Sequence, residues 1–121
     1  MKKKILIVED EEDVLTVETI RLEKSGYEVF SAKNGHEGIA LAQKIHPDLI
    51  FLDLLIPQMR GEEICRELKG NPETKDIPVV FITASQVEKV EQKVIMNGAQ
   101  AYIIKPFETE ELMAVVKRFT A

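Results

Sequence analysis

The chain has few of the residues that mark specialised protein classes. It contains a single cysteine, Cys65, and no tryptophan among 121 residues. One cysteine cannot build a disulfide framework or a zinc site made from several cysteines. Six glycines and five prolines are too few for a collagen or a low-complexity, disordered chain. These absences leave an ordinary globular protein as the expectation.

Long apolar runs and an excess of basic charge are also missing. No run approaches the roughly 18 residues that span a bilayer. Ile5 to Val8 follow three lysines as in a signal peptide, but this stretch is too short and acidic residues follow it at once. The net charge of −5 does not give the chain as a whole the basic surface that nucleic acids or anionic membranes attract. We therefore expect a cytoplasmic protein that contacts neither DNA nor a membrane directly.

Short apolar runs alternate with longer segments of helical periodicity. The length of the chain suits one domain, residues 1–121. The runs have the length and composition of strands buried in a parallel sheet. They are Ile5–Val8, Tyr27–Ser31, Leu49–Leu52, Val79–Ile82 and Tyr102–Ile104. The periodic segments predict helices near residues 14–25, 38–45, 62–68, 87–96 and 109–119.

Five strand–helix units in succession predict an α/β fold. Crossover connections between parallel strands are right-handed, so the helices should cover both faces of the sheet. The result is a three-layer α/β/α sandwich, and we expect the flavodoxin-like (βα)5 arrangement with strand order 2-1-3-4-5. In the first helix, the apolar stripe should contain Val14, Val17 and Ile20 together with Leu15 and Leu22. Thr109 should cap the start of the last helix.

Polar side chains gather where four of the five strands end. Glu9 and Asp10 follow the first strand, and Asp53 follows the third. Thr83 ends the fourth strand and Lys105 ends the fifth. Open parallel sheets bind their ligands at the carboxyl ends of the strands. The convergence of these residues on one edge predicts a single site there.

The residue types at this edge suit phosphoryl transfer. Carboxylates packed closely repel one another by ~4 kcal/mol per pair at an effective dielectric near 20. A hard divalent cation such as Mg²⁺ relieves this repulsion and also binds phosphate oxygens. A lysine and a threonine hydroxyl can donate to the same oxygens. In-line attack by an aspartate on phosphorus would then give an aspartyl phosphate.

Taken together, these motifs resemble the receiver domain of two-component response regulators. The resemblance covers the whole chain, from the strand that begins at Lys3 to Phe107. The motifs that carry it are the pair Glu9-Asp10, Asp53 within the segment 48–54, Pro57 with Gly61, Thr83-Ala84 and Lys105-Pro106. Any one of them alone is weak, but their combined spacing at the strand ends is specific.

The resemblance implies the roles of the acidic residues. Asp53 would be the phosphoacceptor. Asp10 would bind Mg²⁺ or Mn²⁺ directly, and Glu9 would act mainly through a metal-bound water. The main-chain carbonyl of Leu55 would complete the protein ligands of the metal.

The resemblance also implies a phosphorylation switch. Lys105 would contact the phosphoryl group, and its bond to Pro106 would be cis. Thr83 would reorient toward the phosphoryl group, for which the small Ala84 would leave room. Tyr102 would rotate inward and reshape the face formed by the fourth helix, the fifth strand and the fifth helix.

Two further positions bear on the rate of dephosphorylation. Leu55 and Ser85 lie two residues after Asp53 and Thr83, at positions that in this family tune the rate of dephosphorylation. An apolar Leu55 cannot orient a water molecule, so we expect slow dephosphorylation.

The residues on the last strand and helix bear on self-association. Gln100, Ala101 and Val115 stand where winged-helix members of the family usually carry residues that form salt bridges across a dimer. Because these side chains cannot form such pairs, we expect a monomer or a weak dimer of another kind.

The resemblance implies a stand-alone response regulator. It would accept a phosphoryl group from a histidine kinase or phosphotransfer protein and change its affinity for a downstream protein that the sequence does not identify. It would not be an enzyme beyond self-phosphorylation and slow self-dephosphorylation.

Three alternatives stay open. The chain could be a receiver excised from a longer DNA-binding regulator. It could be a small phosphohydrolase, although Leu55 stands where such enzymes need a second acid. It could be a flavodoxin-like cofactor protein, although acids after the first strand would repel a flavin phosphate.

Several of these residues also fit plain structural roles. Asp53 could cap the loop that follows its strand, and Thr83 could be an ordinary β-branched strand residue. Tyr102 could be a core aromatic. Glu11 to Asp13 are best explained as acids that stabilise a helix N-terminus.

Overall fold

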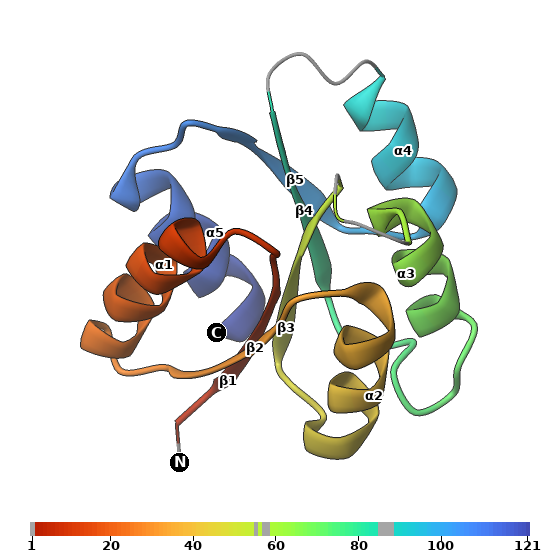
Figure 1. Ribbon diagram of the computed structural model, residues 1–121, viewed down its shortest axis with the longest axis horizontal. Helices are drawn as coiled ribbons and strands as arrows, with labels where there is room; N and C mark the ends of the chain where they lie inside the picture. Colours follow the sequence, from red (N-terminus) through yellow and green to blue (C-terminus); the bar gives the residue numbers. More distant parts are fainter. Residues whose placement is uncertain (1, 55, 57–58, 85–88) are drawn as a thin grey trace.

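A computed structural model describes residues 2–54, 56, 59–84 and 89–121. Ten elements alternate along the chain (Figure 1). They are β1 Lys4–Val8, α1 Glu12–Lys24, β2 Glu28–Ala32, α2 Gly35–Ile45, β3 Leu49–Asp53, α3 Gly61–Lys69, β4 Val79–Ala84, α4 Val90–Asn97, β5 Ala101–Lys105 and α5 Thr109–Thr120. All described helices are too short or too polar to cross a bilayer.

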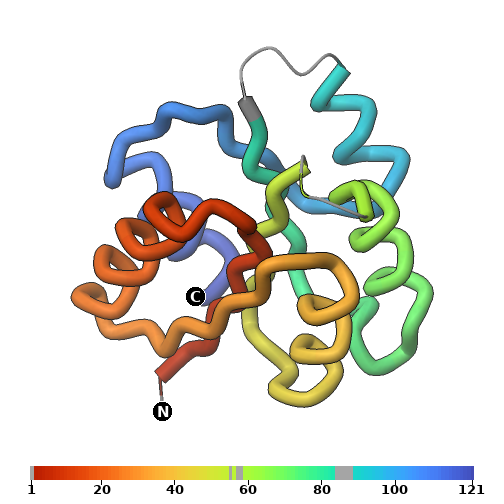
Figure 2. The backbone as a smooth tube through the Cα atoms, viewed as in Figure 1, coloured from red at the N-terminus to blue at the C-terminus, as the bar shows by residue number. Residues whose placement is uncertain are grey.

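The five strands form one parallel sheet in the order β2-β1-β3-β4-β5, which confirms the predicted topology. Helices α1 and α5 cover one face of the sheet, and α2, α3 and α4 cover the other (Figure 1). The backbone trace in Figure 2 shows the same three layers. The predicted α/β/α sandwich is therefore confirmed.

The sheet separates two hydrophobic cores. Leu6 and Val8 of β1 pack on the side of α2, α3 and α4, and Ile5 and Ile7 pack on the side of α1 and α5. This alternation follows from the two-residue period of a strand. Because both faces of β1 and β3 are covered, their sequences are apolar without interruption. Cys65, on α3, is fully buried in the first of these cores.

The apolar stripe predicted for α1 is partly wrong. Leu15 and Leu22 are buried as expected, but Val17 and Ile20 are 47% and 48% exposed. Glu18 takes the inward position instead and is only 2% exposed. The positions that face the sheet are therefore 15, 18 and 22, a spacing of three and four residues. Ile95 of α4 is also exposed, at 78%.

Helix ends also differ from the expectation. The residue that caps α5 is Glu108, which has extended φ and ψ, and Thr109 is the first helical residue. The Glu111 carboxylate accepts a hydrogen bond from the Glu108 N–H at 3.5 Å. Helix α2 begins at Gly35, earlier than predicted, because the Asn34 side chain accepts a hydrogen bond from the Glu37 N–H at 2.9 Å.

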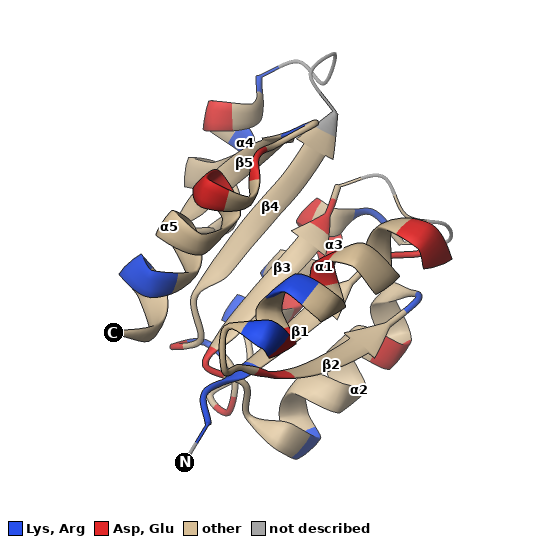
Figure 3. Cartoon of the chain, turned by 90° about the vertical axis from the view of Figure 1, so that its left-hand side faces the viewer, with Lys and Arg blue, Asp and Glu red and all other residues tan. Residues whose placement is uncertain are grey.

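Charged residues of both signs are scattered over the face shown in Figure 3. On α1 the acids Glu12 and Asp13 occupy the first turn, and Arg21 and Lys24 occupy the last. This polarity complements the helix dipole, which supports the structural role expected for the acids after Asp10.

Candidate functional site

The carboxyl edge of the sheet brings three acids together. Glu9 and Asp10 directly follow β1, and Asp53 is the last residue of β3, the strand that pairs with β1. One carboxylate oxygen from each residue lies within 4.8 Å of the others. Glu9 and Asp53 are buried, whereas Asp10 is exposed. The cluster therefore has a covered side formed by two acids and an open side at Asp10.

Lys105 joins the two buried acids. Its Nζ donates a hydrogen bond to Glu9 Oε1 at 3.0 Å and another to Asp53 Oδ2 at 3.1 Å. Lys105 ends β5, at the far side of β4 from Asp53, so its long side chain reaches across the sheet edge. A single ammonium group thus opposes the charges of two buried carboxylates.

The lysine does not fully offset the repulsion between the acids. Burial raises the pKa of Glu9 to about 7, the negative charge of Asp53 adds to this, and Lys105 opposes it. Burial alone would lower the pKa of Lys105, but its hydrogen bonds to Glu9 and Asp53 raise it overall. Near neutral pH the raised pKa favours partial protonation of Glu9. A divalent cation that bound the cluster could replace that proton.

Backbone contacts position these acids. The N–H of Glu11 donates to the second oxygen of Glu9 at 3.4 Å, which orients the carboxylate at the end of β1. Gly61 packs against the end of β3, and a Cβ there would lie only 2.8 Å from the main-chain oxygen of Asp53. This close approach of two backbones explains why a glycine stands at position 61.

The structure also places the other predicted residues. Thr83 is fully buried in β4, one position beyond Ile82, the residue paired with Asp53 in the sheet register. Ala84 is the register partner of Lys105. The bond between Lys105 and Pro106 is cis.

Tyr102 contacts the hydrophobic core and helix α4. Its ring packs at the border of the core under α4, and its hydroxyl donates to Glu91 Oε1 at 3.2 Å. Tyr102 is half-buried and is therefore not a fully buried core aromatic. Leu55 and Ser85, the two positions predicted to tune dephosphorylation, lie outside the described residues, as does Pro57.

Among known proteins, this chain is similar to some relatives over nearly their full length and to others over about half of theirs. The transcriptional regulatory protein PhoB of the phosphate regulon of Rhizobium meliloti is 40% identical over 117 residues, which cover 97% of this chain and 52% of PhoB. The chain spans about half the length of three such transcriptional regulators. The polar-differentiation response regulator DivK of Brucella ovis is 34% identical over 119 residues, which cover 98% of this chain and 97% of DivK.

A solved structure shares the whole fold. The receiver domain of the sensor histidine kinase PA1611 from Pseudomonas aeruginosa, crystallised with a magnesium ion coordinated in its active site cleft, is 26% identical. It superposes with a TM-score of 0.90 over 99% of this chain and 98% of that one. The family model of the response regulator receiver domain matches residues 5–117. With the acidic cluster and lysine at the strand ends, this match shows that the chain belongs to the receiver domain family of two-component response regulators.

Proposed function

We propose that the chain accepts a phosphoryl group on Asp53 from a histidine kinase or a phosphotransfer protein, in the presence of Mg²⁺ or Mn²⁺. The observation that carries this proposal is the double hydrogen bond of Lys105 to Glu9 and Asp53 within a cluster of three carboxylates. An aspartate that lies in a cluster of carboxylates and accepts a hydrogen bond from an ammonium group matches what phosphoryl transfer needs.

The acidic cluster offers carboxylate ligands of the kind that Mg²⁺ prefers. Asp10 and Asp53 would bind it directly, Glu9 would act through a water, and the Leu55 carbonyl would complete the set. The raised pKa of Glu9 supports this assignment, because three acids at this distance are better tolerated with a cation. The magnesium ion in the PA1611 receiver offers an analogy. When bound, the cation would neutralise charge on the phosphoryl oxygens.

Asp53 performs the covalent step. A carboxylate oxygen of Asp53 attacks the phosphorus of a phosphohistidine, a new O–P bond forms, and the P–N bond breaks with its electron pair leaving on the imidazole. Lys105 already lies at hydrogen-bond distance from the Asp53 carboxylate. Its ammonium group could therefore donate a hydrogen bond to a phosphoryl oxygen once the phosphoryl group is attached to Asp53. The chain thus participates in one transfer and does not turn over an external substrate.

The switch then depends on groups around Asp53. A phosphoryl group adds about −1.5 to −2 charge and new acceptor oxygens, which the Thr83 hydroxyl and Lys105 can bind. Inward rotation of Tyr102 would break its hydrogen bond to Glu91 of α4 and so alter the surface of α4, β5 and α5. We propose that this surface binds the downstream protein, as a shift between two pre-existing states.

The relatives suggest two contexts for such a receiver. It resembles DivK over nearly its full length and the transcriptional regulators over about half of theirs. In both contexts residues 1–121 would work as one receiver unit, as a monomer or a weak dimer. The proposed phosphoryl transfer is the same in each.

Intact-mass spectrometry with acetyl phosphate tests the proposal. The protein should gain one phosphoryl group only when Mg²⁺ is present. Asp53→Asn should gain none, whereas Asp76→Asn, at an exposed aspartate outside the cluster, should behave like the unmodified protein. Phosphorylation of Asp53→Asn at an unchanged rate, or none in the native chain with either acetyl phosphate or a phosphorylated histidine phosphotransfer protein, would overturn the proposal.

A further inference from the structure

A groove of about 380 Å³ lies between α3 and α4, which are neighbours on one face of the sheet (Figure 1). Three cations line it, Arg66 of α3, Lys89 at the start of α4 and Lys93 of α4. Glu62 is the one acid among the described residues that line it. The groove is therefore cationic, on a chain whose net charge is −5. The proposed phosphoryl transfer uses none of these side chains.

The register of the two helices is given by two contacts. Lys93 Nζ lies 2.7 Å from Glu62 Oε2, and the Cys65 thiol donates to the Asn97 carbonyl at 3.1 Å. Residue numbers increase together in these two pairs, so α3 and α4 run in the same direction. The one acid that lines the groove is thus already neutralised by Lys93.

Arg66 and Lys89 are left without an acid. Both are exposed, and neither belongs to a salt bridge within the described part of the chain. Arg66 follows Glu62 by one helical turn, and Lys89 precedes Lys93 by one turn. The two unmatched cations therefore lie on opposite sides of the ion pair, about 12 Å apart along the groove.

Met96 adds an apolar contact to the same groove. It lines the groove and is 80% exposed, which is high for a large apolar side chain. It lies beside Asn97, at the end of the groove that contains Arg66. Exposed methionines adapt their shape to a bound surface. The groove thus offers two cations and one apolar contact in a fixed order.

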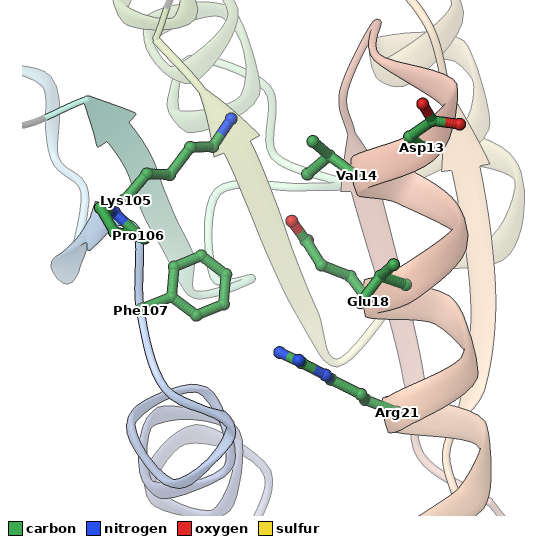
Figure 4. A pocket seen from close by; sticks show the side chains of 8 residues that line it. Asp13, Val14, Glu18, Arg21, Lys105, Pro106 and Phe107 are labelled. Carbon is green, nitrogen blue, oxygen red and sulfur yellow. The ribbon is translucent and has the colours of Figure 1, made fainter.

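The larger cavity, of about 650 Å³ between α1 and the segment after β5, has a different character (Figure 4). Its wall is mainly apolar. Glu18 lines it, but both carboxylate oxygens of this residue are enclosed by the protein. The ammonium group of Lys105 is held by Glu9 and Asp53. This wall does not specify the chemistry of a ligand, whereas the charges of the groove do.

We propose that the groove between α3 and α4 binds an acidic helix of a partner protein, with carboxylates on Arg66 and Lys89 and an apolar side chain against Met96. A groove beside two helices can hold an amphipathic helix along its length. Carboxylates seven or eight residues apart on one helix lie about 10–12 Å apart, which matches the spacing of the two cations. A nucleic acid would be repelled by the negative charge of the rest of the chain.

Titration of the ¹⁵N-labelled full chain with a helical peptide tests the proposal by NMR. The probe is an alanine-based peptide of about 15 residues with two glutamates two turns apart and a leucine beside one of them. The amide shifts should concentrate in residues 62–66 and 89–97. The same peptide with glutamine in place of both glutamates should bind roughly tenfold more weakly or not at all. This comparison uses only the native protein.

Matched variants identify the recognising groups. Arg66→Gln and Lys89→Gln should each weaken binding of the acidic peptide several-fold, because each removes one charged donor. Lys24→Gln changes an exposed lysine of α1, on the other face of the sheet, and should bind like the native chain. Asp53→Asn should also bind like the native chain, so the result does not depend on the proposed phosphoryl transfer.

Several results would overturn the proposal. They are equal affinity for the glutamate and glutamine peptides, shifts outside the two segments, and unchanged affinity in both Arg66→Gln and Lys89→Gln. Inorganic tripolyphosphate serves as a probe without a helix. If it bound as tightly as the acidic peptide and shifted the same amides, the groove would be a general anion site and not a site for an acidic helix.

Discussion

Lys105 Nζ lies 3.1 Å from Asp53 Oδ2, and this contact connects the ends of two strands that are not neighbours in the sheet. The same ammonium group lies 3.0 Å from Glu9. The lysine therefore balances the charges of two buried acids, and a change in the charge of either acid alters the hydrogen bonds of both.

Lys105→Met tests this arrangement. Without the ammonium group, the pKa of Glu9 should rise further, because Lys105 now lowers it. Phosphorylation by acetyl phosphate should slow by roughly ten- to a hundredfold, because a charged donor to the phosphoryl oxygens is lost. Intact-mass time courses measure the rate, and ¹³C NMR of the Glu9 carboxyl measures the pKa.

Lys93→Met is the matched control for this variant. Lys93 forms an ion pair with Glu62 at 2.7 Å, between α4 and α3 and outside the carboxylate cluster. It should phosphorylate at the native rate. Equal slowing in both variants would show that the effect comes from general loss of an ion pair.

Mg²⁺ affinity should depend on pH through Glu9. Its pKa is raised to about 7, so below that value a proton competes with the cation for the cluster. The dissociation constant for Mg²⁺ should increase by roughly tenfold between about pH 8 and about pH 6. Calorimetry in two buffers of different ionisation enthalpy should also detect proton release on binding. Affinity that is constant over this range, without proton release, would contradict the assignment.

Glu18→Gln should stabilise the protein at alkaline pH. The pKa of Glu18 is raised from 4.5 to about 7, so the folded state holds the proton more tightly than the unfolded state. Its contribution to the free energy of unfolding is therefore undiminished below about pH 4 and falls as pH rises toward 7. The variant should gain on the order of 1–3 kcal/mol at about pH 8 and almost nothing at about pH 4.

Urea unfolding at both pH values checks this sign. The difference between Glu18→Gln and the native chain isolates Glu18, since Glu9 and other titrating groups are common to both. Glu23→Gln should show no such pH-dependent difference, because Glu23 is exposed. A gain that is larger at acidic pH would contradict the cause proposed here.

Gly61→Ala should displace the backbone at Asp53, the proposed phosphoacceptor. A Cβ at position 61 would lie 2.8 Å from the Asp53 oxygen and 2.9 Å from the Leu54 Cα, both backbone atoms that cannot turn aside. We expect a loss of stability of about 1–3 kcal/mol and slower phosphorylation. Gly70→Ala, whose Cβ would lie 3.2 Å from the nearest atom and whose φ is −84°, should lose much less. Thermal unfolding and the mass time course measure both effects.

Most of the fold follows from the sequence because the central strands are buried on both faces. Continuous apolar runs between helical segments specify a parallel sheet, and connection rules then restrict the strand order. The acidic cluster and Lys105 follow equally well, since polar residues at parallel strand ends must meet at one edge.

The orientation of α1 is not predictable in the same way. Val14, Val17 and Ile20 form one apolar stripe and Leu15 with Leu22 forms another, so periodicity alone leaves two rotations of the helix. The structure selects the rotation that buries Leu15 and Leu22, and Glu18 is buried with them. Only packing against the sheet reveals this choice, and the cavity at Glu18 depends on it.

The burial of Cys65 has a practical consequence. Its thiol is fully enclosed, donates a hydrogen bond to the Asn97 carbonyl at 3.1 Å, and has a pKa raised by burial to about 11. A thiol reagent in solution can therefore react only after α3 and α4 separate and the thiol ionises. Because it is the only cysteine, the rate of its modification reports how often this part of the molecule opens, with no label or substitution needed.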